Sequence, residues 1–223
     1  MNHLINTNAK VIRDEIYGKP YFIIDDFFVN PDSVYKQYFK KLGDLHRKGE
    51  ENSLNEIFFI DRRKEVRGYI VEEINKIVKY LTNQSPASEC FFTNETLFFD
   101  EPFNDTEKNW WWMHIDHGYN MIIYMTKKGD SCGTNLYSPE DYYSNNIHYG
   151  NEHVNPWIPK EKIRPIKHLE GKYNRLVLFD GKIPHGMNLV KGKFINKYRR
   201  NIVGFYADYL DYLRFKSMLN EKK

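Results

Sequence analysis

The sequence predicts an α+β fold in which helices come first and a barrel or jelly roll of short strands follows. Apolar residues recur at helical spacing over residues 34–42 and again over 66–81. Beyond residue 86 the sequence pattern changes to short runs that are rich in aromatic and β-branched residues and are separated by residues typical of turns. The content of 17 Tyr and 15 Phe favours strands over a helical bundle. A chain of 223 residues can bury the core of one such domain.

Residues 1–86 are expected to form a support of strands and helices for the rest of the fold. Asn30 followed by Pro31 is a helix-start signal, and the apolar spacing continues as far as Gly43. The predicted elements are an irregular start (1–19), a buried strand (21–24), a helix (30–43), a charged loop (44–56), a short strand (57–60) and a second helix (66–82) that ends at 83–86.

Residues 87–206 are expected to supply the sheets, and residues 207–223 a C-terminal amphipathic helix. Residues 138–172 interrupt the strands as a long polar insertion, and a loop of that length in a compact domain is usually functional or mobile, so we expect a lid. The predicted strands are 89–99 (one long or two short), 121–126, 133–137, 173–179 and 198–206.

Composition excludes several classes of function. The 33 basic and 30 acidic side chains nearly balance at a net charge of +3, which gives no argument for nucleic acid or an anionic membrane as a partner. Cys90 and Cys132 are too few for a disulfide framework, which favours a reducing cytoplasm. Neither a secretory signal nor an apolar run of membrane-spanning length is visible, so we expect a cytoplasmic protein.

The residues that carry chemistry are His114, Asp116 and, far along the chain, His185. Side chains alternate sides along a β-strand, so His114 and Asp116 are expected to point to one face and reach a single metal ion. Two histidines and one carboxylate on one side of a metal, with open positions opposite, suit non-haem Fe(II). With His185 as the third ligand, the sequence predicts an iron site.

Further segments follow these residues in an order that resembles a known family. The chain is similar to the Fe(II)- and 2-oxoglutarate-dependent oxygenases, and most of all to their prolyl-hydroxylase-like branch, over residues 90–206. The matching segments are His-Ile-Asp at 114–116, Ile-Ile-Tyr-Met-Thr at 122–126, Cys-Gly-Thr-Asn-Leu at 132–136, Asn-Arg-Leu-Val-Leu-Phe at 174–179, His185, and Arg-Arg-Asn-Ile at 199–202.

The resemblance implies a double-stranded β-helix (jelly roll) core with N-terminal supporting helices, and a role for several residues. Arg199 is the favoured partner of the far carboxylate of 2-oxoglutarate, with Arg200 as its rival on the opposite face of the strand. Tyr124 and Asn201 are expected to assist Arg199. For Tyr124 the alternative, a core aromatic residue without a role in the site, is favoured almost equally. His117 and Trp112 are candidates to face the substrate.

The implied activity is a dioxygenase that uses Fe(II), 2-oxoglutarate and dioxygen to hydroxylate a C–H bond. A protein or peptide side chain is the first expectation for the substrate, followed by a small molecule or amino acid, and then by a nucleobase. Two other readings stay open: a metal-binding jelly roll without catalysis, and a cupin-like enzyme that uses the metal without 2-oxoglutarate. The sequence does not determine the oligomeric state.

Overall fold

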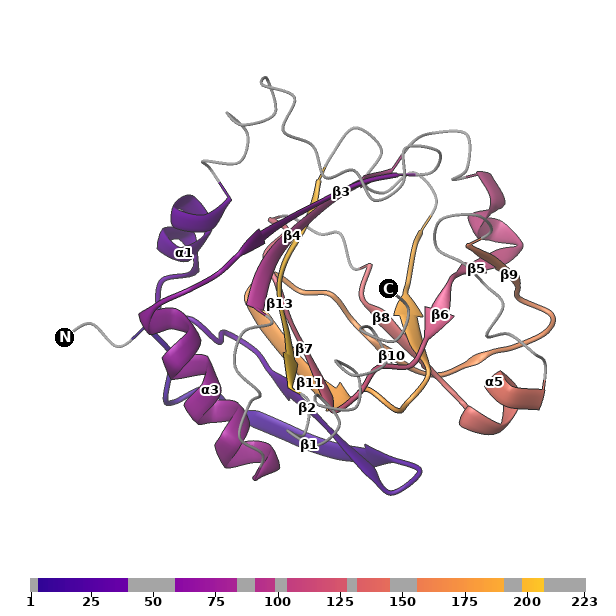
Figure 1. The fold of residues 1–223 in the computed structure, drawn as a ribbon, viewed down its shortest axis with the longest axis horizontal. Helices are drawn as coiled ribbons and strands as arrows, with labels where there is room; N and C mark the ends of the chain where they lie inside the picture. The colour runs from indigo at the N-terminus through magenta and orange to yellow at the C-terminus, as the bar shows by residue number, and fades with distance from the viewer. Residues whose placement is uncertain are drawn as a thin grey trace, which may run out of the picture.

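The computed structural model describes residues 4–39, 59–83, 91–98, 104–127, 132–144, 156–190 and 198–206. In this part of the chain two antiparallel sheets face each other, with the helices at 31–38 and 69–82 on the outer face of the larger one (Figure 1). The larger sheet has the strand order β1 (Val11–Ile16), β2 (Lys19–Ile24), β11 (Arg175–Asp180), β7 (Tyr119–Tyr124), β13 (Arg199–Tyr206), β4 (Phe91–Phe98) and β3 (Phe59–Glu65).

The smaller sheet has the order β10 (Pro165–Leu169), β8 (Thr134–Tyr137), β12 (His185–Met187) and β6 (Met113–His114). A separate pair joins β5 (Asn109–Trp111) to β9 (Trp157–Pro159). Between β6 and β13 the chain crosses repeatedly from one sheet to the other: β6, β8, β10 and β12 lie in the smaller sheet, and β7, β11 and β13 in the larger. The prediction of an α+β fold is confirmed, and the sheets are antiparallel.

The central strands of the larger sheet are buried on both faces, which explains their nearly continuous apolar sequences. In β7, Met121 and Ile123 face the helices, whereas Ile122 and Tyr124 face the smaller sheet. Strand β11 alternates in the same way. One core therefore lies between helices and sheet, and a second between the two sheets.

Three α-helices occur in the described residues: α1 (Pro31–Tyr38), α3 (Tyr69–Thr82) and α5 (Pro139–Ser144). The Asn30 side chain caps α1 by accepting from Ser33 N at 3.1 Å, as the start signal predicted. In α3, buried residues recur every four positions, at Ile70, Ile74 and Val78, and pack on the larger sheet. None of the helices in the described ranges is long and apolar enough to cross a membrane.

Three expectations differ from the structure. Residues 11–16, predicted to be irregular, form β1, which joins β2 through a tight turn at Tyr17 and Gly18, both with positive φ. The expected loop at 138–172 instead contains α5, β9 and β10 within its described residues. Helix α3 begins three residues later than expected, after Gly68. The predicted loop at 44–56 and C-terminal helix at 207–223 lie outside the described residues.

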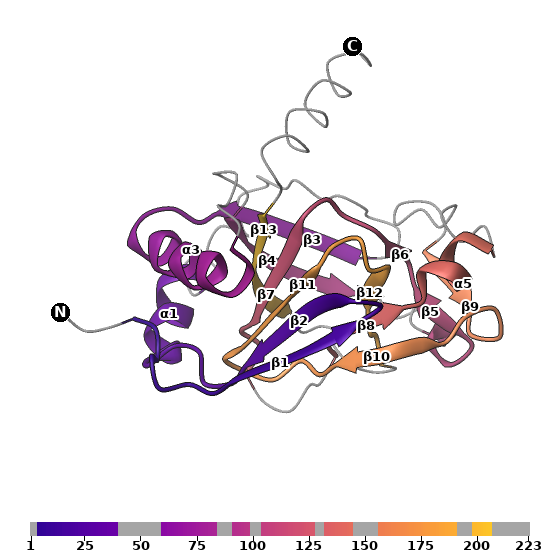
Figure 2. The same cartoon turned by 90° about the horizontal axis from the view of Figure 1, so that it is seen from below.

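The sequence did not predict strands β1 and β10, because each lies at the edge of its sheet. Exposed polar residues there obscure the alternation of apolar and polar side chains that identifies a strand. The two edges lie side by side (Figure 2). Lys167 Nζ of β10 is 3.9 Å from Asp14 Oδ2 of β1 and 5.5 Å from the centre of the Tyr21 ring. These contacts join the two sheets on the side where β1 and β10 meet.

Candidate metal centre

The two histidines come together through strand pairing. Strands β6 and β12 are antiparallel neighbours, and His114 stands directly opposite His185 in their register. Directly opposed residues carry their side chains on the same face of a sheet. The ring centres are accordingly 4.4 Å apart. Register in the smaller sheet, which links residues 71 positions apart, therefore builds the first half of the site.

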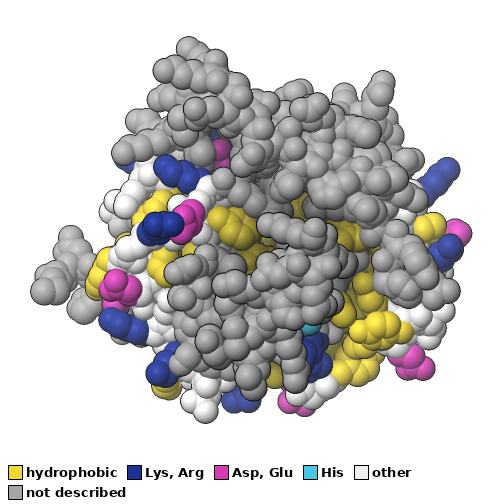
Figure 3. Space-filling view, viewed as in Figure 1, with side chains coloured by type: hydrophobic (Ala, Val, Ile, Leu, Met, Phe, Trp, Pro, Cys, Tyr) yellow, Lys and Arg dark blue, Asp and Glu magenta, His cyan; other side chains and the backbone are white. Residues whose placement is uncertain are grey.

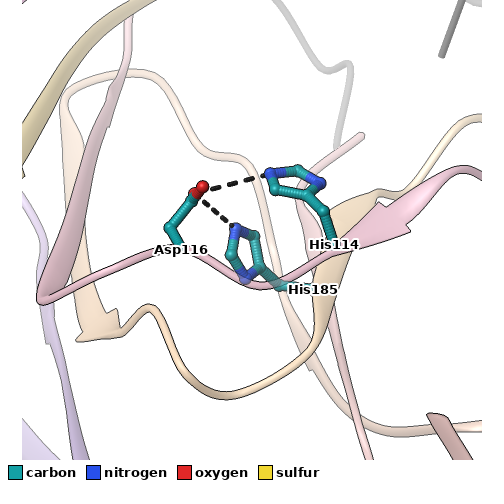
Figure 4. A group of neighbouring side chains, drawn as sticks. All are labelled: His114, Asp116 and His185. Atoms are coloured by element: carbon teal, nitrogen blue, oxygen red, sulfur yellow. Dashed lines mark ion pairs between the residues drawn. The ribbon is translucent and has the colours of Figure 1, made fainter. Parts of the chain in front are cut away.

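Asp116 completes the cluster from the turn that follows β6. The sequence reasoning placed Asp116 on the same strand as His114, but the strand ends at His114. Backbone hydrogen bonds hold the turn in place: Asp116 N donates to Gly181 O at 2.8 Å, and Gly181 N donates to Gly118 O at 2.6 Å. The carboxylate nevertheless turns back toward both histidines (Figure 4).

The three side chains could hold one metal ion. Asp116 Oδ2 is 3.3 Å from His185 Nε2 and 3.5 Å from His114 Nε2, and all three candidate ligand atoms lie within 4.8 Å of one another. Two ligand atoms that each sit about 2.1 Å from an ion, at right angles, are about 3 Å apart. Small side-chain movements would bring the cluster to that spacing.

The protonation of the cluster suits a cation. His185 Nδ1 is 2.8 Å from the carbonyl oxygen of Ile183, which can only accept, so Nδ1 carries the proton and Nε2 keeps its lone pair. Burial opposes the ionisation of Asp116, but its contacts with the neighbouring His114 and His185 outweigh the burial and hold the pKa of Asp116 well below the usual range. Asp116 is therefore a carboxylate at physiological pH.

The cluster opens into a pocket between the two sheets. Apolar side chains of the larger sheet, Ile122, Val203 and Phe205, form one wall, and Trp112 lies on the opposite side. The remaining lining residues are Phe92, Asn94, Thr96, Trp111, Asn120, Thr134, Gly186, Met187, Arg199 and Asn201, with the three cluster residues.

Arg199 reaches across this pocket from β13 to the smaller sheet. Its side chain is buried, and Nη1 donates to Met187 Sδ at 3.3 Å. With the Asn201 amide turned to satisfy both its groups, the Asn201 oxygen accepts from Arg199 Nη1 at 2.7 Å. Met187 is two residues from His185 along β12, a rise of about 7 Å. The guanidinium and the metal cluster thus occupy two ends of one short pocket.

The structure separates the two competing arginines. Arg199 lines the pocket, whereas Arg200 lies on the opposite face of β13, where Nε bonds Glu95 and Nη1 donates to Tyr35 Oη at 2.6 Å. Tyr124 stands behind the pocket wall: its hydroxyl is 2.9 Å from Thr134 Oγ1, and Thr134 is the group that lines the pocket. Asn201 lines the pocket beside Arg199.

Of the two candidates for substrate contact, Trp112 and His117, only the first lines the pocket. Trp112 lines the pocket and stacks on the His114 ring, with centroids 4.3 Å apart and planes at 13°. His117 is exposed and is not among the pocket-lining residues. Its position one residue after Asp116 turns it toward solvent.

Sequence reasoning missed Asn120, which contacts two members of the cluster. Asn120 Nδ2 donates to Asp116 Oδ2 at 2.6 Å and lies 2.9 Å from His185 Nε2. A signal was present, because Asn120 is the polar residue of the apolar run 119–124 and shares the inward-facing parity of Ile122 and Tyr124.

Replacement of Gly186 by alanine is expected to open the cluster. A Cβ at Gly186 would lie 2.6 Å from the backbone oxygen of Trp112, so β6 and β12 would have to move apart and carry His114 away from His185. We expect a loss of about 1–3 kcal/mol in unfolding free energy and at least about tenfold weaker binding of Co(II), measured by chemical denaturation and calorimetric titration.

The control is Gly204→Ala, whose Cβ would meet the movable ring of Phe91 at 2.9 Å. It should lower stability without changing Co(II) affinity. Equal ion affinity in Gly186→Ala and the unchanged protein would contradict the prediction.

Comparison with known proteins gives no family assignment. No protein-family model matches the chain, and no curated protein matches it significantly in sequence. The structure itself describes a mainly antiparallel β-sheet protein whose His-x-Asp motif and distal histidine form a cluster that could bind a metal ion.

Proposed function

We propose that the protein is an Fe(II)- and 2-oxoglutarate-dependent dioxygenase of the prolyl-hydroxylase-like branch, built on a double-stranded β-helix. The observation that carries the proposal is the pairing of two functions in one pocket. A cluster of two histidines and a carboxylate lies at one end, and the buried guanidinium of Arg199 lies at the other. Most metal sites need only the first of these.

The shape of the pocket supports 2-oxoglutarate as the cosubstrate. This molecule carries a metal-chelating 2-oxo acid at one end and a carboxylate at the other, joined by two methylene groups. Ile122 and Val203 offer an apolar wall along the middle, and the guanidinium of Arg199 offers paired N–H donors that match a carboxylate. Asn201 orients Arg199, and Tyr124 acts by orienting the hydroxyl of Thr134.

The topology also supports this family. From β6 to β13 the chain crosses repeatedly between two facing sheets, except that β8 and β10 both lie in the smaller one, and such repeated crossing is the pattern of a double-stranded β-helix. The candidate ligands lie on or next to strands of the smaller sheet, and Arg199 comes from the last strand of the larger. This distribution supports the proposal.

The residues of the chain have separate tasks in the proposed reaction. Fe(II) and 2-oxoglutarate, when bound, couple oxidation of the oxo acid to succinate and carbon dioxide with insertion of one oxygen atom of dioxygen into a substrate C–H bond. His114, Asp116 and His185 would hold the ion from one side and leave the other open. Arg199 fixes the direction of the cosubstrate, and the apolar wall excludes water.

For the substrate we propose an uncharged group, first of all a protein or peptide side chain. Phe92, Phe205 and Trp112 are partly exposed aromatic members of the pocket lining, and Phe92 packs on Phe205 with ring centres 5.9 Å apart. On the face in Figure 3, the described Lys and Arg side chains are scattered among acidic and apolar ones, which does not favour a nucleic acid. A small molecule or amino acid is the second candidate.

The test is an anaerobic titration of metal-free protein with Fe(II) and then with 2-oxoglutarate. We expect a weak visible charge-transfer band that forms only when both are present, is lost in His114→Ala and is weakened in Arg199→Ala. If iron binds but no band forms, the cosubstrate is wrong and the cupin-like or non-catalytic reading takes its place. Retention of the band in His114→Ala would disprove the assignment of this ligand.

A further inference from the structure

Asn120 contacts the metal cluster from the larger sheet. It is the second residue of β7, its side chain is 3% exposed, and it faces the smaller sheet. Its Nδ2 is 2.6 Å from Asp116 Oδ2 and 2.9 Å from His185 Nε2. One amide nitrogen therefore touches two of the three candidate ligands, and it touches the atoms through which they would bind an ion.

Both of these atoms accept hydrogen bonds. The Asp116 oxygen that faces Asn120 accepts from its amide, and His185 directs its Nδ1–H to the carbonyl oxygen of Ile183, which leaves a lone pair on Nε2. The two N–H groups of the Asn120 amide can therefore serve one acceptor each. In donating to both, the amide satisfies two groups that would otherwise need a cation or water.

The orientation of the Asn120 amide is set by the two acceptors, Asp116 Oδ2 and His185 Nε2, that its nitrogen faces. Asn120 Oδ1 is buried and has no hydrogen-bond partner among the described residues. A buried acceptor without a partner lowers stability, and an apolar side chain at this position would avoid that cost. Packing alone therefore does not account for an asparagine in the apolar strand β7.

We propose that Asn120 is a positioning residue of the metal centre, a role that rests on the proposed metal site. Before an ion arrives, its amide holds Asp116 and His185 in their converged arrangement. When an ion takes the lone pair of His185, the hydrogen bond to Asp116 persists, because a carboxylate oxygen can accept from the amide and bind the ion together. Asn120 thereby fixes the direction of the carboxylate in both states.

The test compares Asn120→Leu, which removes both donors, with Asn120→Thr, which keeps one hydroxyl donor in a strand-compatible side chain. Asn94→Leu is the matched control, because Asn94 lines the same pocket from β4 and makes none of the described contacts with the cluster. Calorimetry gives the Kd for Co(II), the visible spectrum of the Co(II)-loaded protein reports the ligand geometry, and thermal melting checks the fold.

We expect the Kd to rise about 10- to 100-fold in Asn120→Leu, by less in Asn120→Thr, and by under about threefold in Asn94→Leu. The Co(II) spectrum should change in Asn120→Leu and stay constant in Asn94→Leu. If Asn120→Leu does not fold, unchanged affinity and spectrum in Asn120→Thr and a second variant, Asn120→Ser, count against the proposal.

Wild-type affinity and an unchanged spectrum in Asn120→Leu would overturn the positioning role and leave the metal site intact. If the unchanged protein binds neither Co(II) nor Fe(II), the proposed function fails, and the positioning role fails with it. The two failures are therefore distinguishable.

Discussion

Replacing Asp116 with alanine is expected to weaken Co(II) binding by about two to three orders of magnitude. Four-ligand structural sites bind zinc with about 10–16 kcal/mol, so one ligand contributes roughly 2.5–4 kcal/mol. Asp116 is also the charged member of the cluster, and it lies within 3.5 Å of both histidines. Its loss removes both a ligand and the negative charge that attracts the cation.

Tryptophan fluorescence offers a direct measurement. Trp112 stacks on the ring of His114 at 4.3 Å, so a paramagnetic ion bound to that histidine would quench its emission. In the unchanged protein we expect saturable quenching by Co(II), and in Asp116→Ala a shift of the titration to much higher Co(II) concentration.

Asp25→Ala is the matched control, because Asp25 is a partly buried carboxylate that pairs with Arg175 at 2.6 Å and is not among the pocket-lining residues. It should leave the titration unchanged. Equal Co(II) affinity in Asp116→Ala and Asp25→Ala would show that the ion binds elsewhere.

The local sequence was sufficient to name the three candidate ligands, but it did not predict how the fold brings them together. Strand alternation predicts that His114 and Asp116 share one face of a strand, yet Asp116 lies in a turn that is held by hydrogen bonds involving Gly118 and Gly181. The approach of His185 depends on its register with His114, a long-range property that no local pattern encodes.

Residues whose role depends on tertiary contacts were the hardest to predict. Asn120 is one polar residue in an apolar strand, and periodicity analysis treats such a residue as an exception. Tyr124 shows the converse: its position in the strand was suggestive, but its hydroxyl bonds Thr134 behind the pocket wall. The alternation of β13 did separate Arg199 from Arg200 correctly by face, because a period of two needs no tertiary information.

Replacing Arg199 or Arg200 with methionine is expected to affect different properties: Arg200→Met lowers stability, and Arg199→Met weakens the binding of 2-oxoglutarate. Arg200→Met should destabilise the fold, because it takes from the fully buried Glu95 its contact with the guanidinium. Breaking one side of a buried ion pair costs about 3 kcal/mol or more, which corresponds to a Tm lower by roughly 6–12 °C in a chain of this size. Binding of 2-oxoglutarate should persist wherever the protein is folded.

Arg199→Met should instead retain most of the stability and lose the cosubstrate. Two charge-assisted hydrogen bonds to a carboxylate contribute about 1.5–3 kcal/mol each, so the Kd for 2-oxoglutarate should rise by at least about 100-fold. Calorimetric titration of the Co(II)-loaded protein and thermal melting measure both quantities on both variants. Loss of 2-oxoglutarate binding in a folded Arg200→Met protein, with binding intact in Arg199→Met, would reverse the assignment. Adjacent side chains of one strand would then have exchanged the roles that their opposite faces indicate.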